Sequence, residues 1–298
     1  MADWNAKLYL KFEDERTRPS ADLLAQVAPA EARCVVDLGC GPGNSTELLA
    51  ARFPEADVIG VDTSPDMLEK ARQRLPRATF IEADVATWRP EQPVDVLFAN
   101  AVLQWLPNHD ELFPHLMTLL APGGILAVQM PNNLTEPSHA LMRDVAREER
   151  WRDKLAKASA ARVPLAPPGH LYDLVKPSAR RVDIWQTTYQ HPLDGPAAII
   201  EWLKATGLRP FLAPLNEAEQ AAFLADYRER LTEGYPPRVD GKVLLAFADA
   251  PAPVALEQHT PATLTEPVAL QADLARIRAR GFAIDDEEFS PGIRCVAA

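Results

Sequence analysis

The stretch that decides the fold is Val35–Thr46, with the sequence VVDLGCGPGNST. Its apolar residues up to Leu38 predict a buried strand, and its three glycines predict a turn whose backbone must do without Cβ atoms. Asn44–Thr46 then supplies residues that favour the start of a helix. A second apolar run ends at Asp62, nineteen residues after Gly43. Together these features indicate a nucleotide-cofactor site at the end of a strand.

The spacing of the glycines bears on the kind of cofactor. Dinucleotide-binding folds use G-x-G-x-x-G, which lets a pyrophosphate sit on a helix N-terminus. This chain has G-x-G-x-G instead, with Asn44 where the third glycine of that pattern would fall. Asp37 places a carboxylate before the glycines, and a buried acid there is costly unless a cationic group pairs with it. The pattern therefore favours a ligand with an ammonium group and gives no indication of a phosphate.

This glycine turn resembles motif I of the class I S-adenosylmethionine-dependent methyltransferases. Four more landmarks of that family come after it in order, namely the strand-end acids Asp62 and Asp84, the apolar run 94–100, and a Pro-Gly-Gly turn at 122–124. In the family, the first acid binds the ribose hydroxyls and the second lies beside the adenine amino group. The resemblance implies an α/β, Rossmann-like fold with a doubly wound, mostly parallel sheet, and S-adenosylmethionine as cofactor. A doubly wound fold with another ligand is the alternative.

The resemblance also implies which residues bind the cofactor. Asp62 has a structural alternative as a helix cap, and Asp84 has one as an exposed acid or an N-cap before Thr87, so both alternatives stay open. The expected cofactor-binding residues are Asp37, Gly39, Gly41, Gly43, Asp62, Met67, Asp84, Val85 and Asn100.

Four further segments narrow the resemblance to the trans-aconitate 2-methyltransferase family over about residues 1–247. They are the N-terminal region, with 3–5 and 9–19, and the segments 101–109, 130–133 and 185–189. The implied reaction is methyl transfer to a carboxylate oxygen of trans-aconitate, or of a similar small polycarboxylate, giving a monomethyl ester. A carboxylate is ionised at neutral pH, so positioning is expected to replace a general base. The alternatives are another small-molecule O- or C-methyltransferase and a non-catalytic cofactor-binding chimera.

A polycarboxylate acceptor needs cationic partners, preferably arginines, whose planar fork pairs bidentately. Gln104 and Trp105 follow the fourth expected strand, where donor and acceptor would meet, although Trp105 is equally well explained as a core residue. Tyr9 belongs with Trp4 to an expected N-terminal lid, for which a disordered terminus is the alternative. The substrate-binding candidates are Tyr9, Arg16, Arg18, Gln104, Trp105, Arg162, His170 and Arg209, with Arg147 and Arg180 also considered. No metal is expected.

The composition limits the possible partners. The chain has 298 residues, 47% of them apolar, and a net charge of −11, which argues against nucleic acid and anionic membrane surfaces. Three cysteines without a pairing pattern favour a reducing cytoplasm. No apolar run approaches eighteen residues, so neither export nor membrane spanning is expected.

The C-terminal part departs from the methyltransferase pattern after the run GKVLLAF at 241–247. The segment beyond this run resembles part of the effector-binding domain of IclR-type bacterial transcription regulators, which carry a similar run. We therefore predict a chimera, with a methyltransferase domain at 1–247 and a non-native IclR-like tail at 248–298. A homodimer formed through this tail is a further expectation.

The alternation of apolar and helical segments predicts βαβ units. Strands are expected at 34–38, 57–61, 79–82, 94–99, 124–130 and 182–190, and helices near 44–52, 65–74, 109–120 and 138–158. A helical cap is expected within 135–180 and 195–237, over the carboxyl ends of the strands. We expect residues 292–298, in preference to 242–247, to complete the sheet, with a helix at 270–281 packed against it.

Overall fold

The structure is a computed structural model that describes residues 12–27, 31–162, 164–247, 283–286 and 294–297. The chain divides into two compact units, Met1–Asp249 and Ala250–Ala298. The expected lid residues Trp4 and Tyr9, and the helix expected at 270–281, lie outside the described residues.

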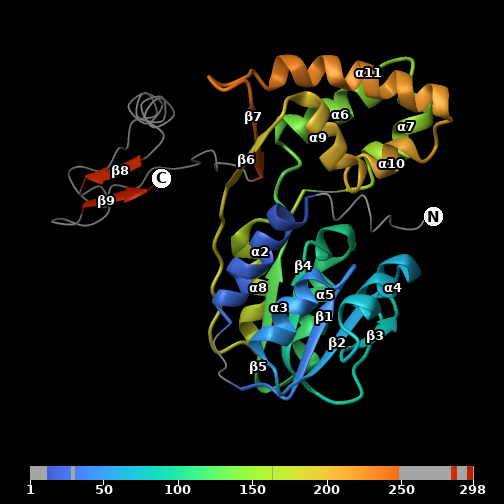
Figure 1. Cartoon of the computed structure of the whole chain (residues 1–298). Helices are drawn as coiled ribbons and strands as arrows, with labels where there is room; N and C mark the ends of the chain where they lie inside the picture. Colours follow the sequence, from blue (N-terminus) through green and yellow to red (C-terminus); the bar gives the residue numbers. More distant parts are fainter. Residues whose placement is uncertain (1–11, 28–30, 163, 248–282, 287–293, 298) are drawn as a thin grey trace. The chain divides into compact units, whose positions relative to one another are not determined.

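Five parallel strands form the central sheet of the first unit (Figure 1), in the order β3-β2-β1-β4-β5. All five residues of β1 are buried, as is typical of a parallel strand covered on both faces. The strand order reverses between β1 and β4, and α/β sheets bind ligands at such a point. The doubly wound, parallel α/β fold is therefore confirmed. The strands are β1 (Cys34–Leu38), β2 (Asp57–Asp62), β3 (Thr79–Glu82), β4 (Val94–Asn100) and β5 (Leu120–Gln129).

Helices cover both faces of this sheet because each buries an apolar stripe against it. On one face, α2 (Glu13–Ala25) and α3 (Asn44–Arg52) pack their leucines against β1 and β4. On the other face lie α5 (His109–Thr118) and α8 (Pro168–Val175). Helix α4 (Pro65–Arg74) packs against Phe80 of β3. Within the described ranges, none of the helices combines the length and apolarity that crossing a membrane requires.

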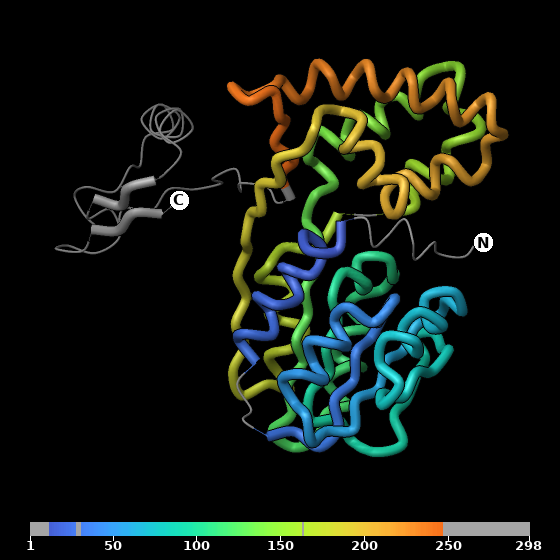
Figure 2. The backbone as a smooth tube through the Cα atoms, viewed as in Figure 1, coloured from blue at the N-terminus to red at the C-terminus, as the bar shows by residue number. Residues whose placement is uncertain are grey.

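A helical cap lies over the carboxyl ends of the strands (Figures 1 and 2). It has its own hydrophobic core around Trp151, Phe223 and Tyr227. Phe12 and Trp202, with ring centroids 4.8 Å apart, connect the start of α2 to this core. The cap contains α6 (Pro137–Arg147), α7 (Arg152–Ser159), α9 (Pro196–Lys204), α10 (Arg209–Leu212), α11 (Glu217–Gly234), β6 (Tyr189–Leu193) and β7 (Val243–Phe247).

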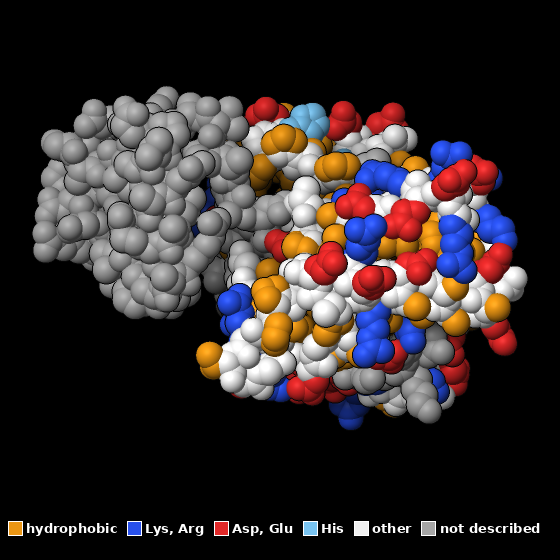
Figure 3. Space-filling view, turned by 90° about the horizontal axis from the view of Figure 1, so that it is seen from above, with side chains coloured by type: hydrophobic (Ala, Val, Ile, Leu, Met, Phe, Trp, Pro, Cys, Tyr) orange, Lys and Arg blue, Asp and Glu red, His pale blue; other side chains and the backbone are white. Residues whose placement is uncertain are grey.

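The outer face of the cap carries side chains of both charges (Figure 3). Helix α11 contributes Arg228, Glu229, Arg230 and Glu233, all exposed, and Arg230 pairs with Glu148 at 3.0 Å. Exposed pairs of this kind contribute little to stability. This outer face is a solvated surface, so the site is to be sought between the cap and the sheet.

Two expected elements differ most from their bounds in the structure, and residues 168–175 of the expected cap instead form α8 on a face of the sheet. The predicted strand at 182–190 is wrong over most of its length, because β6 begins only at Tyr189 and pairs antiparallel with β7. The five residues of β7 supply partners for 189–193 alone, and this pair forms a separate sheet of the cap. The helix predicted at 138–158 is interrupted at Glu148, which adopts an extended conformation and separates α6 from α7.

The prediction that residues 292–298 complete the methyltransferase sheet is wrong. In the second unit, β9 (Arg294–Ala297) instead pairs antiparallel with β8 (Ala283–Asp286). The alternative segment, 242–247, does not complete the sheet either, because it forms β7 of the cap. Pairing between neighbours in the chain closes a short loop and so costs less conformational entropy than a distant pairing. Among the described strands, β4 is the one neighbour of β5.

Candidate active site

The glycine turn after β1 has a backbone that side chains would disturb. Gly39 has φ +66°, and a Cβ atom there would lie 2.3 Å from Cγ2 of Val102. Gly41 has φ +54°, but a Cβ atom there would meet no atom within 4 Å, so this part of the turn faces open space. The Asp62 carboxylate accepts hydrogen bonds from the backbone N–H groups of Gly41 and Ser64, each at 2.9 Å. Asp62 therefore fixes the turn from the neighbouring strand.

Asp37, at the end of β1, is fully buried behind this turn. Its Oδ2 accepts hydrogen bonds from Ser45 at 2.7 Å and Thr46 at 2.6 Å. Its Oδ1 is buried without a hydrogen-bond partner among the described residues. Burial raises the pKa of Asp37 to about 7, although the two hydroxyl bonds lower it, and the charge of Asp62 adds to the rise. A cationic ligand group near Oδ1 would favour the ionised carboxylate.

A pocket lies between this turn and α2, and we call it the glycine-turn pocket. Arg16 lines it and is the charged residue among its described lining. Nη2 of Arg16 also donates to the backbone oxygen of Trp202 at 2.8 Å, and its guanidinium lies 5.2 Å from that indole ring. Arg16, expected to bind the acceptor, is therefore placed at the cofactor side and linked to α9 of the cap. The lining consists of Arg16, Thr17, Ser20, Gly39, Cys40, Gly41, Pro42, Asn44, Ser45 and Asn100.

These residues fit the amino-acid part of S-adenosylmethionine. That part carries one ammonium and one carboxylate group. Asp37 lies behind Ser45 with an unpartnered buried oxygen, which suits the ammonium, and Arg16 suits the carboxylate. Oδ1 of Asn100 is a second buried acceptor without a partner among the described residues of this region. The pocket is thus lined by one cationic side chain and has an acidic side chain behind Ser45, an arrangement that suits a zwitterionic ligand.

Four other expected cofactor residues lie outside the described lining of this pocket. Gly43 precedes α3 with φ +92°. Met67 is buried in α4, where its N–H donates to Ser64 at 3.3 Å, and Val85 is buried in the core beside the sheet. Asp84 is exposed and accepts a hydrogen bond from the N–H of Ala86 at 2.9 Å. This bond agrees with the structural alternative for Asp84, and its role at the adenine stays a prediction.

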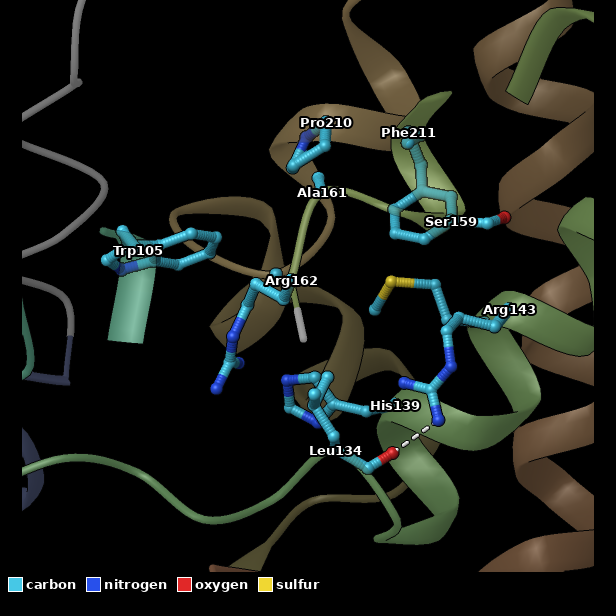
Figure 4. Close-up of a pocket in the computed structure, with 12 residues that line it drawn as sticks. Trp105, Leu134, His139, Arg143, Ser159, Ala161, Arg162, Pro210 and Phe211 are labelled. Carbon is cyan, nitrogen blue, oxygen red and sulfur yellow. Dashed lines mark hydrogen bonds between the residues drawn. The ribbon is translucent and has the colours of Figure 1, made fainter. Parts of the chain in front are cut away.

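A second pocket, which we call the arginine pocket, lies between the end of β4 and the cap (Figure 4). It brings together Trp105, from η2 (Leu103–Trp105), and Arg162, two of the expected acceptor residues. The guanidinium of Arg162 lies 5.1 Å from the Trp105 ring and donates to Asn133 Oδ1 and the Pro131 oxygen, each at 3.2 Å. The lining consists of Trp105, Leu134, His139, Met142, Arg143, Ala158, Ser159, Ala161, Arg162, Gly207, Pro210 and Phe211.

The sequence reasoning missed Arg143, which lines the arginine pocket from α6. Its Nη2 donates to the backbone oxygen of Leu134 at 2.5 Å, while Nη1 is buried without a partner among the described residues. Nε of Arg162 is likewise buried without a partner among the described residues. The described lining contains no acidic residue. The spacing of His139 and Arg143, four residues apart on one helix, is the signal that could have placed both on one face.

Burial and the two arginines set the protonation states in this pocket. Burial, together with the smaller effects of the charges of Arg162 and Arg143, lowers the pKa of His139 to about 3, so the imidazole is neutral. Burial and the charge of Arg143 lower the pKa of Arg162 to about 10, so this guanidinium remains charged at neutral pH. The arginine pocket therefore holds two cations, a neutral imidazole and no described counter-charge.

Gln104, beside Trp105 in η2, is buried. Its Nε2 donates to the oxygen of Ala101 at 2.7 Å, and its Oε1 has no partner among the described residues. Ala101 itself has φ +53°, an unusual conformation for a residue with a side chain. The sharp turn after β4 is thus held by Gln104, and it places Trp105 in the pocket.

The other acceptor candidates lie outside the described lining of both pockets. Arg18 lies 3.9 Å from Asp22, and His170 Nε2 lies 2.6 Å from Asp110 Oδ1. Arg147 is exposed and donates to Asp144. Arg180 is exposed in the segment after α8, and Arg209 is the first residue of α10.

Known proteins resemble the chain in two parts. Residues 35–124 match the family described as "Methyltransferase domain", and residues 240–298 match "Bacterial transcriptional regulator IclR C-terminal". The expected likeness of the tail is thereby confirmed. The chain is 60% identical over 247 residues to a trans-aconitate 2-methyltransferase of Afipia carboxidovorans. It is 59% identical to that of Rhodopseudomonas palustris and 55% to that of Yersinia pestis. Each match covers 83% of this chain and 96% of the relative. The chain therefore belongs to the trans-aconitate 2-methyltransferase family of S-adenosylmethionine-dependent methyltransferases.

Proposed function

We propose that this methyltransferase acts on a carboxylate oxygen of trans-aconitate, or of a similar small polycarboxylate, and forms a monomethyl ester. The observation that carries the proposal is the arginine pocket, with two partly buried arginines, each with a buried nitrogen that has no partner among the described residues, and no acid in its described lining. Uncompensated charge is costly away from water, and a polycarboxylate would supply the counter-charge. The names of the relatives support the same substrate.

The residues of the pocket fit a reaction that needs no base. S-adenosylmethionine, when bound, supplies a methyl group on a sulfonium centre, and a carboxylate is already an ionised nucleophile at neutral pH. His139 is neutral and buried between cationic residues, so it serves as a hydrogen-bonding wall. Arg162 and Trp105 hold the acceptor at the carboxyl end of β4, and the cap excludes water. Catalysis then comes from orientation.

Turnover with S-adenosylmethionine and trans-aconitate tests the proposal. We expect release of S-adenosylhomocysteine and a monomethyl ester, identified by mass spectrometry. At saturating concentrations of both substrates, kcat should be constant between about pH 6 and pH 8, because the carboxylates titrate near pH 4.

Three outcomes would contradict this proposal. A sigmoidal rise of kcat through about pH 7 would indicate a base and a hydroxyl acceptor. Turnover of another acceptor with none of trans-aconitate would indicate a different methyltransferase. Binding of S-adenosylhomocysteine without turnover of any carboxylate or hydroxyl acceptor would indicate the non-catalytic chimera.

A further inference from the structure

Building on the proposed function, we infer that Arg143 determines specificity by binding a non-reacting carboxylate different from the one that Arg162 binds. Both arginines line the arginine pocket, but different parts of the chain anchor them. Leu134 holds Arg143, whereas Pro131 and Asn133 hold Arg162. Each keeps one buried N–H donor without a partner among the described residues, Nη1 of Arg143 and Nε of Arg162. The pocket therefore offers two separate donors for an anion.

His139 separates the two donors. In the view of Figure 4, its ring lies between the two guanidinium groups. Both arginines lower the pKa of His139, and the residue is only 5% exposed. A carboxylate on either side of this neutral ring can pair with one arginine without meeting a competing acid. This arrangement fits two carboxylates of one molecule better than a single carboxylate shared by both arginines.

The chemistry of the acceptor leads to the same division. A carboxylate held bidentately by arginine has its lone pairs engaged in hydrogen bonds, which makes it a poorer nucleophile. The carboxylate that attacks the methyl group must therefore be one that neither arginine holds in this way. Two bound carboxylates balance the two guanidinium charges, and a third is left to react. A second methylation of the same molecule would require one arginine to release its partner, so the reaction stops at the monoester.

Three dicarboxylates, each lacking a different carboxylate of trans-aconitate, test this inference. They are itaconate, cis-glutaconate and methylfumarate. Binding of each acid, and of trans-aconitate, is titrated calorimetrically on the S-adenosylhomocysteine complex of the wild-type protein and of Arg143→Gln. We expect the substitution to weaken the binding of trans-aconitate and of two of the diacids roughly 10- to 100-fold, because one charge-assisted pair is lost. The affinity for the remaining diacid, which lacks the carboxylate that Arg143 binds, should change less than about threefold on the same reasoning.

Arg147→Gln is the matched control, because Arg147 lies one turn further along α6, is exposed and is outside the pocket lining. It should leave all four acids unaffected. Equal affinity for S-adenosylhomocysteine and an equal Tm in Arg143→Gln would show that the fold is intact, whereas a loss of either would indicate a structural role. If the substitution weakens the binding of all four acids by the same factor, the inference is overturned. If the wild-type protein neither binds nor methylates any of the four, the proposed function itself is wrong.

Discussion

The glycine-turn pocket and the arginine pocket are built in different ways. The first is formed mostly by residues 39–45, which make up the turn and the start of α3, and it is completed by residues of α2 and by Asn100 of β4. The second joins four segments, around residues 105, 134–143, 158–162 and 207–211. The glycine-turn pocket therefore depends mainly on the backbone geometry of one turn, whereas the arginine pocket depends on how the cap folds over the sheet. Substitutions on the two sides should accordingly affect different ligands.

The largest effect is expected from Asp62→Ala, which should lower the affinity for S-adenosylhomocysteine about a hundredfold or more. The carboxylate holds the turn through Gly41 and Ser64, and its proposed bonds to the ribose hydroxyls would each contribute roughly 1.5–3 kcal/mol. Calorimetric titration measures the change. Asp57→Ala, an exposed acid at the opposite end of β2, is the control and should have no effect. A loss below about threefold would show that the motif has been misassigned.

The same contrast explains what could be predicted from the sequence. The bounds of β1, β3, α3 and α4 agree with the predictions, because buried parallel strands and capped helices have strong local patterns. Arg162 and Trp105 were expected at the acceptor site through the family resemblance, and both line the arginine pocket.

The misses also have physical causes. Arg143 was missed because an arginine on a helix becomes a pocket residue only through the packing of that helix against others. The segment 292–298 had the composition of a strand, but composition does not identify its partner, and it pairs within the second unit. Arg16 was assigned to the acceptor, and this role stays a prediction, while the packing of α2 places its side chain in the glycine-turn pocket.

An intermediate effect is expected from the pH dependence of Asp37. A carboxyl with a pKa of about 7 in the folded state, against about 4 when unfolded, binds more protons when folded. The free energy of unfolding of the ligand-free protein should therefore fall as the pH rises from about 4 to about 7. At about 1.4 kcal/mol for each pKa unit, the contribution of this group is roughly 4 kcal/mol.

Urea unfolding at pH 5, 6, 7 and 8 compares the wild-type protein with Asp37→Asn. The amide retains an oxygen that can accept the hydrogen bonds of Ser45 and Thr46, but it has no charge to bury. Its stability should depend less on pH than that of the wild-type protein. Parallel curves for the two proteins would show that Asp37 does not titrate in this range.

The smallest effect is expected from removing residues 250–298. Every described strand of the first unit has its hydrogen-bonded partner within that unit, in the five-stranded sheet or in the β6–β7 pair. Strands β8 and β9 pair only with each other among the described residues. The shortened protein should therefore keep its Tm within a few degrees, roughly 1 kcal/mol of stability. Its affinity for S-adenosylhomocysteine should stay within about twofold, the change that less than 1 kcal/mol produces.

Thermal unfolding, calorimetry and size-exclusion chromatography of both proteins test this expectation. Aggregation or a large fall in Tm would show that the tail protects part of the methyltransferase unit, and the outer edge of β5 is the place to examine first, since an unpaired strand edge favours association. A change from dimer to monomer with unchanged cofactor binding would instead assign the tail to dimerisation. In that case the IclR-like segment would set the oligomeric state, while the glycine-turn pocket would need only residues of the first unit.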